Sequence, residues 1–479
     1  MRLLELLDGI DTVAVCANTD EEVKGLKIHS AEVEDGDLFF CMKGRRDDGN
    51  LHLKEIRAEF VAVTETVPQE GIPYILVADV RKAYALMSSA YWGHPSSGMR
   101  FVAAVGTNGK TSTVHYISSL LTSAGLRTGR IGTEGHFIEG EKVGMSLTTP
   151  DSFELNELLF KMRTRGVDVV AAEVSAHAIK LQKTAGITAE VAVFTNLTRD
   201  HLDYFRSFEE YKETKLGYFT SGAVKKAVVN ADDPYGRELM ERAADAGVPV
   251  VSYGLYSPAD SFAVNVREDM DGVRFVANLS DDIVEVRSHL MGEFNVYNLL
   301  AAMTVARELG VSAETLARSV GRVRAVKGRF SVLKNDRGSV IIDYAHTPDG
   351  LEQLLRTART LTKARLITVF GCGGERDRGK RRLMGETAAK FSDFTVVTSD
   401  NPRFEDPERI IADVTSGMAG AKFKTFVDRT EAIAYAMSEM SEGDTVVIAG
   451  KGNEDHLDIR GKKVPYSDFD AAMRWGQAR

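Results

Sequence analysis

The stretch from Phe101 to Ala124 constrains the fold most, because an apolar run passes straight into a glycine-containing turn and then into a helical pattern. The run FVAAV has the length and composition of a buried strand, and GTNGKTS follows it without a gap. Apolar residues then recur with helical spacing at Val114, Ile117, Leu120, Leu121 and Ala124, and Gly125 ends the pattern. The sequence therefore predicts a strand, a tight turn and a helix in direct succession.

The same alternation of apolar runs and helical segments continues along the chain. The central runs are VDVVAAEV, AEVAVFTNL and KKAVVNADD, and those after Ser331 are SVIIDY, RLITVF, FTVVTSD and DTVVIAG. Shorter runs (DLFFCM, EFVAV, YILVA) come earlier, and 479 residues suggest about three domains. We predict an α/β protein with a smaller N-terminal α/β domain (1–90), a central P-loop-type parallel sheet with helices on both faces (91–330), and a doubly wound, Rossmann-like C-terminal domain (331–479).

Composition and charge exclude several classes of protein. Hydrophobic residues make up 43% and charged residues 27%, as in globular proteins, and the net charge of −9 argues against a nucleic-acid binder. The three cysteines contain no CxxC pair, so neither a disulfide framework nor a zinc site is expected. Glu5 and Asp8 interrupt the first apolar stretch, and no run of 18 apolar residues occurs. We expect a cytoplasmic monomer with neither a nucleic-acid nor a membrane partner.

GTNGKTS has the chemistry of a phosphate-binding loop. Glycines let the backbone approach phosphate, the helix start supplies N–H groups, Lys110 supplies a charge, and Thr111 can hold Mg²⁺. Two residues separate Gly106 from Gly109, whereas four separate the glycines of the generic P-loop. A plain turn with a surface lysine is the alternative. The predicted ATP contacts in this loop are Gly106, Thr107, Asn108, Gly109, Lys110, Thr111 and Ser112.

Further polar residues follow the other apolar runs. Glu173 ends VDVVAAEV, where a carboxylate can complete a Mg²⁺ shell or, alternatively, cap the next helix. In TNLTRDHLDYF, His201 and Asp203 are expected near the start of a helix, with Lys215 about three turns along it. Spacing alone favours a solvated Lys215.

Two other segments contain candidate nucleotide contacts. Asn295 and Asn298 in GEFNVYNLLAA could bond a base edge, and Asp343 in DYAHTPDGLE could bond a ribose hydroxyl. Because asparagine also favours helix starts, both interpretations stay open. Arg329 lies in the neighbouring GRF segment.

In their order along the chain these motifs resemble the Mur ligases, the ATP-dependent amino-acid ligases of peptidoglycan precursor synthesis. GTNGKTS, FTNLTRDHLDY, the Asn-x-x-Asn-x-x-Ala-Ala segment and DYAHTPD carry the resemblance. FGCGGERDRGKRRLMG and TSDNPRFEDP resemble the branch that adds the third peptide residue, to UDP-N-acetylmuramoyl-L-alanyl-D-glutamate. The resemblance covers essentially the whole chain and implies successive domains for the uridine nucleotide, ATP and the incoming amino acid.

The resemblance implies that ATP phosphorylates the side-chain carboxylate of D-glutamate and that an amine then attacks the acyl phosphate. Mg²⁺ is the implied cofactor, and ATP is a co-substrate. The implied catalytic residues are Lys110, Glu173, His201 and Lys215. The implied metal site combines Thr111 with Glu173, His201 and Lys215, the last as N6-carboxylysine, whose carbamate is a hard oxygen ligand. The implied ATP contacts outside the loop are Asn295, Asn298, Arg329 and Asp343.

The amino acid implied by the resemblance is meso-2,6-diaminopimelate, with L-lysine as the alternative. The two differ by one distal carboxylate, which a guanidinium binds in a bidentate manner. Arg403 directly follows a proline in DNPR, and diaminopimelate-adding members resemble this chain in having arginine there. A simple turn with a solvated arginine is the other interpretation of DNPR. The implied pocket consists of Arg376, Asp400, Asn401, Pro402, Arg403, Gly450 and Glu454.

The resemblance is weaker in the region implied to bind UDP-MurNAc-L-Ala-D-Glu. Its implied contacts are Ser30, Gly44, Thr148, Thr149, Ser175 and Lys183. The departures from the usual family residues are His29 and Ala31 around Ser30, Leu147 for asparagine, Ala176 for serine and Lys183 for arginine. The detailed contacts in this region therefore stay open.

Two other functions compete with this interpretation. Folylpolyglutamate synthases have a similar compact loop but usually begin close to it, whereas about a hundred residues precede Gly106 here. A nucleotide-dependent switch has no need for Arg376, Arg403 and Glu454 at separate strand ends. Both features favour the cell-wall ligase.

Overall fold

The computed structural model describes residues 1–44, 47–269, 271–335 and 337–477, and the chain forms two compact units. The first unit contains Met1–Ala103, Gly125–Ala192 and Gly217–Lys226, and the second contains Ala104–Ala124, Val193–Leu216 and Ala227–Arg479. The division passes through strands β6 (Arg100–Val105) and β11 (Val191–Phe194). The three domain ranges expected from the sequence stay a prediction.

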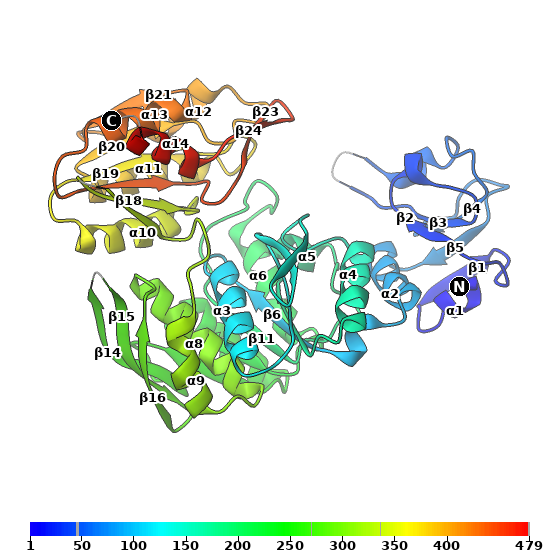
Figure 1. The fold of residues 1–479 in the computed structure, drawn as a ribbon. Helices are drawn as coiled ribbons and strands as arrows, with labels where there is room; N and C mark the ends of the chain where they lie inside the picture. Colours follow the sequence, from blue (N-terminus) through cyan, green and yellow to red (C-terminus); the bar gives the residue numbers. More distant parts are fainter. Residues whose placement is uncertain (45–46, 270, 336, 478–479) are drawn as a thin grey trace. The chain divides into compact units, whose positions relative to one another are not determined.

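A five-stranded sheet forms the N-terminal part of the first unit, drawn in blue in Figure 1. The strand order is β1-β5-β4-β3-β2, and only β1 is antiparallel to its neighbour. The runs DLFFCM, EFVAV and YILVA form β3, β4 and β5, as predicted, because their apolar side chains pack with helix α2 into one core. The elements are α1 (Leu3–Leu6), β1 (Thr12–Cys16), β2 (Gly25–Lys27), η1 (Ser30–Glu32), β3 (Asp37–Phe40), η2 (Gly49–His52), β4 (Phe60–Thr64), β5 (Tyr74–Val77), α2 (Val80–Tyr91) and η3 (Pro95–Gly98).

The remainder of the first unit is a sheet in the order β11-β6-β10-β7-β8-β9. VDVVAAEV forms β10, which is buried along its length and parallel to β7, while β8 and β9 continue the sheet in antiparallel fashion. Its further elements are β7 (Thr128–Gly132), β8 (Gly135–Ile138), β9 (Glu141–Gly144), α4 (Ser152–Thr164), β10 (Val169–Glu173) and α5 (Ala176–Lys180).

In the second unit the strand order is β16-β15-β14-β13-β12-β11. Strands β12 and β13 are parallel, as predicted, but β14, β15 and β16 form an antiparallel meander that the sequence analysis did not anticipate. Helix α3 packs against α8, and Figure 1 shows both beside this sheet. The elements are α3 (Lys110–Ser123), α6 (Phe208–Thr220), β12 (Ala227–Asn230), α7 (Pro234–Asp245), β13 (Val250–Gly254), β14 (Ser261–Asp269), β15 (Gly272–Leu279), β16 (Asp282–Ser288), α8 (Glu293–Glu308), α9 (Ala313–Ser319) and η4 (Val320–Arg322).

The C-terminal sheet, yellow to red in Figure 1, has the order β17-β18-β22-β19-β20-β21 and is parallel except for β17. Helices α10, α11 and α12 share one core with it, and α13 and α14 share another, so the predicted doubly wound fold is confirmed. The elements are β17 (Ser331–Asn335), β18 (Gly338–Asp343), α10 (Pro348–Leu361), β19 (Leu366–Phe370), α11 (Gly379–Phe391), β20 (Phe394–Thr398), α12 (Pro407–Thr415), β21 (Phe423–Phe426), α13 (Arg429–Ser438), β22 (Asp444–Ala449), β23 (His456–Ile459), β24 (Lys462–Pro465) and α14 (Asp468–Gln477). Within the described residues, no helix combines the length and apolarity needed to cross a membrane.

Candidate active site

The loop GTNGKTS forms the turn between β6 and α3, as the sequence predicts. Gly109 precedes α3 with a left-handed φ of 85°, and a β-carbon there would lie 2.6 Å from Asn298 Oδ1, so both conformation and space require glycine. Lys110 Nζ donates to the carbonyl oxygens of Gly106 (2.9 Å) and Thr107 (2.8 Å). The backbone of the loop therefore bends so that two of its carbonyl groups bind the Lys110 ammonium group. Phosphate binding by this loop stays a prediction.

The segment TNLT (195–198), which follows β11, is hydrogen-bonded to this loop. Thr107 N donates to Asn196 O (2.9 Å), and Asn108 N donates to Asn196 Oδ1 (2.8 Å). In return, Thr195 Oγ1 donates to Asn108 O (2.7 Å). Sequence reasoning missed this role of Thr195 and Asn196. The available signal was that TNL follows its strand directly, just as GTN follows β6.

Lys215 is buried on the inner side of α6, with 1% of its surface exposed. Its Nζ contacts the hydroxyl groups of Tyr211 and Thr107, the latter at 3.3 Å, and lies 4.1 Å from the centre of the Tyr211 ring. Burial, with the charge of Lys110 as a second cause, lowers the pKa of Lys215 well below its usual value. The interpretation of Lys215 as a solvated lysine, which spacing alone favoured, is therefore wrong.

The expectation that His201 and Asp203 lie at the start of a helix is also wrong, because α6 begins only at Phe208. Both residues lie in the preceding loop, where His201 has a left-handed φ of 55°. Lys215 is accordingly about two turns into the helix, not three. Because the chain turns at His201, the helix begins later in the sequence than expected. The spacing of hydrophobic residues does not predict such a turn.

Asn295 and Asn298 lie within α8 and do not cap it, since Gly292 occupies the N-cap. Tyr116 OH donates to Asn295 Oδ1 (2.9 Å), and Thr113 Oγ1 donates to Asn298 Oδ1 (3.3 Å). Both donors belong to α3, the helix that follows the phosphate loop. Asn295 thus lies in the first turn of α8, where its Nδ2 also donates to Met291 O (2.8 Å), whereas Asn298 is one turn further along, with its Oδ1 close to Gly109.

Arg329 and Asp343 lie at the beginning of the C-terminal sheet. Arg329 Nη2 donates to Thr111 Oγ1 (3.2 Å), and its guanidinium lies 4.3 Å from the centre of the Tyr344 ring. Asp343 accepts from the backbone N–H groups of Phe330 (2.7 Å) and Ala345 (2.6 Å), while burial raises its pKa. The structure therefore brings Arg329 to the phosphate loop and holds Asp343 in a fixed orientation.

A second connection from the C-terminal sheet to the phosphate loop was not predicted. Asn108 Nδ2 donates to Asp349 Oδ2 (3.0 Å), and Thr347 Oγ1 lies 3.4 Å from Asn108 Oδ1. Thr347 also caps α10 by accepting from Gly350 N (3.1 Å). The motif DYAHTPD thus orients the side chain at the third position of the loop.

The residues expected at the amino-acid site converge at the ends of β20 and β22. Asn401 Nδ2 donates to Glu454 Oε2 (3.0 Å), and Tyr344 OH donates to Glu454 Oε1 (3.2 Å). Lys451, which the sequence analysis missed, is fully buried and donates to both Asn401 Oδ1 (3.0 Å) and Glu454 Oε2 (2.7 Å). Asp400 lies beside this group, with Oδ1 3.8 Å from Lys451 Nζ.

Arg403 is held by several contacts and is not a freely solvated turn residue. Its Nη1 donates to Gly374 O (2.7 Å), and its Nε lies 3.7 Å from Asp458 Oδ2. A β-carbon at Gly450 would lie 2.7 Å from Asp400 Oδ2, so glycine allows the two strand ends to approach each other. Gly374 N donates to Asn401 O (2.9 Å), so DNPR lies alongside the loop that follows β19, and Arg376 in that loop pairs with Asp203 at 3.6 Å.

Glu173 and the predicted sugar–peptide residues form a cluster in the first unit. Glu173 is 1% exposed and accepts from Thr133 N (2.8 Å); Ser175, not Glu173, caps α5. Thr149 Oγ1 donates to Glu173 O (2.8 Å), and Thr148 bonds the Thr133 hydroxyl (3.1 Å). The capping interpretation of Glu173 is therefore wrong.

The other predicted sugar contacts are spread over several elements of the same unit. Lys183 Nζ pairs with Asp151 Oδ1 (2.7 Å) and lies 3.5 Å from Thr149 O. Ser30 begins the short helix η1, and Gly44, in the loop after β3, donates to Asp47 O (2.8 Å). Lys183 is therefore next to Thr149, whereas Ser30 and Gly44 lie in connections between strands of the N-terminal sheet.

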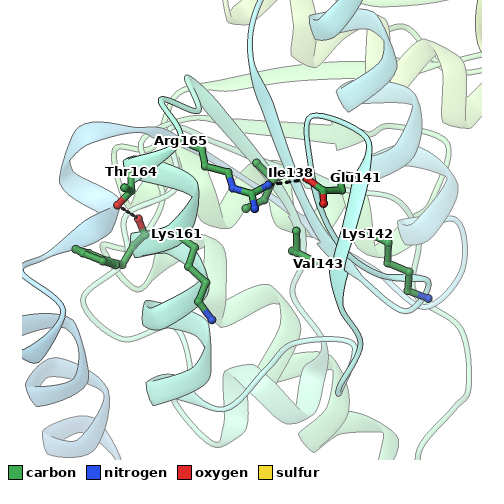
Figure 2. A pocket seen from close by; sticks show the side chains of 8 residues that line it. Ile138, Glu141, Lys142, Val143, Lys161, Thr164 and Arg165 are labelled. Atoms are coloured by element: carbon green, nitrogen blue, oxygen red, sulfur yellow. Dashed lines mark hydrogen bonds and ion pairs between the residues drawn. The ribbon is translucent and has the colours of Figure 1, made fainter.

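Figure 2 shows a separate cavity of about 520 Å³ between the β8–β9 hairpin and α4. It is lined by Ile138, Glu141, Lys142, Val143, Phe160, Lys161, Thr164 and Arg165. Arg165 Nη1 pairs with Glu141 Oε2 (2.8 Å), and Lys161 Nζ pairs with Glu157 Oε1 (2.6 Å). These residues belong to none of the motifs, so we do not assign this cavity to the active site.

Among residues 1–44, 47–269, 271–335 and 337–477, no three His, Cys, Asp or Glu side chains converge so as to hold a metal ion. A Mg²⁺ site that relies on one or two carboxylates together with substrate phosphates does not require such a group.

Two family models match the chain: the Mur ligase middle domain over residues 105–306 and the Mur ligase glutamate ligase domain over residues 328–452. A UDP-N-acetylmuramoyl-L-alanyl-D-glutamate–2,6-diaminopimelate ligase of Syntrophomonas wolfei is 40% identical over 485 residues, 98% of each chain. A solved structure of a ligase with that same name is 30% identical, with a TM-score of 0.70 over 100% of this chain and 99% of its own. A Mycobacterium tuberculosis folylpolyglutamate synthase complexed with ADP and AMPPCP shares the fold, at 18% identity and a TM-score of 0.64 over 76% of this chain and 91% of its own.

Proposed function

The chain belongs to the Mur ligase family, and from this premise we propose that it adds meso-2,6-diaminopimelate to UDP-MurNAc-L-Ala-D-Glu at the expense of ATP. It is then an ATP-dependent amide ligase of peptidoglycan precursor synthesis, on which cell shape and division depend. The proposed substrates are cytoplasmic, and we propose that location for the reaction. The observation that carries the choice of amino acid is the convergence of DNPR and GKGNED at the ends of β20 and β22, the two strands that flank β19.

The first step transfers the γ-phosphoryl group of ATP to the D-glutamate side-chain carboxylate, which gives an acyl phosphate and ADP. Lys110 and the N-terminus of α3 supply positive charge where the phosphates would bind. Arg329, bonded to Thr111, adds a guanidinium at the same loop. An amine of the incoming amino acid then attacks the acyl carbon, phosphate leaves, and the nitrogen releases a proton.

Magnesium fits the donor chemistry of the loop, because Mg²⁺ prefers hard oxygen ligands combined with phosphates. We propose Thr111 Oγ1, His201 and carbamylated Lys215 as the residues of the second unit that face the ion. For Glu173, the proposal rests only on the family resemblance and on its carboxylate at the end of β10. When bound, the ion would neutralise phosphate charge during transfer.

The environment of Lys215 supports its proposed modification. The lowered pKa of Lys215 favours the uncharged amine, and only this form adds to carbon dioxide. The resulting carbamate is an anion that Mg²⁺ can accept as a ligand. The hydroxyl groups of Thr107 and Tyr211 lie within hydrogen-bonding distance of Nζ and can donate to the oxygens of the carbamate.

The C-terminal cluster suits a substrate with a carboxylate and an ammonium group at its far end. We propose that Arg403 binds the distal carboxylate and that Glu454 binds the distal ammonium, with Asn401 orienting Glu454. Gly450 permits close packing beside Asp400, and Arg376 approaches from the neighbouring loop. L-lysine lacks the distal carboxylate and would leave Arg403 without that contact.

The experiment that tests the proposal is phosphate release by the purified protein with ATP, Mg²⁺ and UDP-MurNAc-L-Ala-D-Glu. A panel of amino acids is offered, including meso-diaminopimelate, L-lysine and L-glutamate. We expect release that depends on meso-diaminopimelate. Release driven equally well by L-lysine would contradict the assigned amino acid, and release that no amino acid stimulates would contradict the ligase.

A further inference from the structure

Two loops of the second unit face each other with complementary charges. The first comprises residues 199–203, between β11 and α6, and the second comprises residues 376–380, between β19 and the first turn of α11. Three oppositely charged pairs join them, and each loop contributes both signs of charge. The pairs are Arg199–Asp377, Asp200–Lys380 and Asp203–Arg376.

The pair between Arg199 and Asp377 has the best geometry. Arg199 Nε lies 2.9 Å from Asp377 Oδ2, and Arg199 Nη2 lies 3.2 Å from Asp377 Oδ1, which is a bidentate arrangement. Asp377 is buried, and its Oδ1 also accepts from Gly379 N (2.8 Å), so the carboxylate is fixed before the guanidinium binds. This pair is therefore the firm connection between the two loops.

Gly379 gives Arg199 the space to reach Asp377. A β-carbon at this position, the first residue of α11, would lie 2.4 Å from Arg199 Nη2 and 3.1 Å from Asp377 Oδ1. The nearer atom is the end of a flexible side chain, which can move away at little cost to the backbone. Alanine at 379 therefore removes the pair without removing either charge.

The two flanking pairs are looser. Lys380 Nζ lies 3.6 Å from Asp200 Oδ1, and Arg376 Nη1 lies 3.6 Å from Asp203 Oδ2. Asp200 and Lys380 are both buried, whereas the Arg376 side chain is 40% exposed. Burial alone would raise the pKa of Asp200, but the nearby imidazole of His346 (3.8 Å) and the charges of Lys380 and His201 hold it well below its usual range.

We propose that the three pairs form a latch in which Arg199 and Asp377 are positioning residues that hold loop 376–380 while Arg376 binds the incoming amino acid. The inference rests on the proposed function, because it uses Arg376 as a substrate contact. A carboxylate of the substrate can replace Asp203, whose pair with Arg376 is long and exposed. The bidentate Arg199–Asp377 pair keeps the loop in place when that exchange occurs.

The kinetic test compares Arg199→Gln, Asp377→Asn, their double variant and Gly379→Ala in the full-length enzyme. Each should raise KM for meso-diaminopimelate about tenfold, equivalent to about 1.4 kcal/mol, while KM for ATP changes less than about twofold. The double variant should be no worse than the worse single one, because the two side chains act as a unit. Arg199→Lys should recover part of the loss. Arg382→Gln, which removes an exposed cation within α11 that pairs with Glu386 of the same helix, is the matched control and should behave as the wild type.

Hydrogen exchange of the amides in residues 376–380, without substrates, separates the latch from the proposed function. We expect faster exchange in Arg199→Gln and Gly379→Ala than in the wild type and the Arg382→Gln control. Equal exchange in all four proteins, or additive kinetic losses in the double variant, would overturn the latch. A wild type that does not use meso-diaminopimelate would instead overturn the proposed function, and the exchange comparison would still decide the latch.

Discussion

At the scale of single residues, two lysines near the phosphate loop have opposite environments. Lys110 is bonded to two backbone carbonyls of its own loop, whereas Lys215 is enclosed by α6 and two hydroxyl groups. The position of Lys110 at the start of α3 could be predicted from seven consecutive residues. The burial of Lys215 could not, because it depends on how α6 packs against a loop about a hundred positions earlier.

Replacing Lys110 tests the phosphate site. Lys110→Ala should lower kcat about a hundredfold to a thousandfold, because a charge that stabilises the transferring phosphoryl group is lost. The unfolding temperature should be close to that of the wild type. Lys225→Ala, which removes an exposed lysine, is the control. Near-normal turnover of Lys110→Ala would exclude the assigned role.

Replacing Lys215 tests the proposed carbamate. Lys215→Ala should be nearly inactive, and added short-chain carboxylates should restore part of the activity by supplying an oxygen ligand. Lys212→Ala, which removes a glutamate-paired lysine on the same helix, should retain activity. The intact wild-type protein should carry the extra mass of one carbon dioxide when bicarbonate is present. Full activity of Lys215→Ala would refute the proposal.

At the scale of elements, the buried parallel strands were predicted from the sequence, whereas the antiparallel strands that extend the sheets were not. The apolar runs that became β10, β19, β20 and β22 are buried on both faces, so composition alone identifies them. The β15–β16 turn is made by Ser280 and Asp281, both with positive φ (50° and 81°), instead of the Asn-Gly or Asp-Gly that marks most such turns. The residue types in this turn therefore did not predict the hairpin.

Glu405 connects the loops that surround the proposed amino-acid site. Arg381 donates to both Glu405 oxygens (3.0 Å each), and Glu375 N donates to Oε1. Burial alone would raise the pKa of Glu405, but these bonds hold it at about 2. These contacts form a charged anchor between DNPRFEDP and GERDRGKR. The sequence of neither motif alone predicts it.

This anchor predicts a pH dependence of stability. The pKa of Glu405 is lower in the folded protein than in the unfolded chain. Its contribution to the free energy of unfolding is therefore present above the unfolded pKa of about 4.3 and is lost as pH falls towards about 2. Glu405→Gln should lower the free energy of unfolding by about 2 kcal/mol at pH 7. The difference from the wild type should shrink between about pH 4.5 and 2 in denaturant titrations. A constant difference across this range would contradict the assignment.

Arg403 tests the specificity assigned to DNPR. In Arg403→Ala the preference for meso-diaminopimelate over L-lysine should fall about a hundredfold, because a charge-assisted pair is worth about 3 kcal/mol. The comparison uses kcat/KM for both amino acids. Arg409→Ala, which removes an exposed arginine on α12, should keep the wild-type preference. An unchanged preference in Arg403→Ala would exclude Arg403 as the selecting residue.

At the scale of the whole molecule, the second unit brings the predicted nucleotide motifs and the amino-acid motifs into one hydrogen-bonded structure. Asn108 and Thr111 of the phosphate loop bond Asp349 and Arg329 of the C-terminal segment. The order of motifs in the sequence identified the family. Which of them touch could not be read from that order, because the contacts join positions more than two hundred residues apart.

The identity of the ligated product tests the central claim most directly. Equal concentrations of meso-diaminopimelate and L-lysine are offered together with ATP, Mg²⁺ and UDP-MurNAc-L-Ala-D-Glu, and the products are identified by mass spectrometry. The account predicts the diaminopimelate tripeptide as the dominant product, formed in step with ADP. A dominant lysine tripeptide, or ATP hydrolysis without any tripeptide, would contradict it.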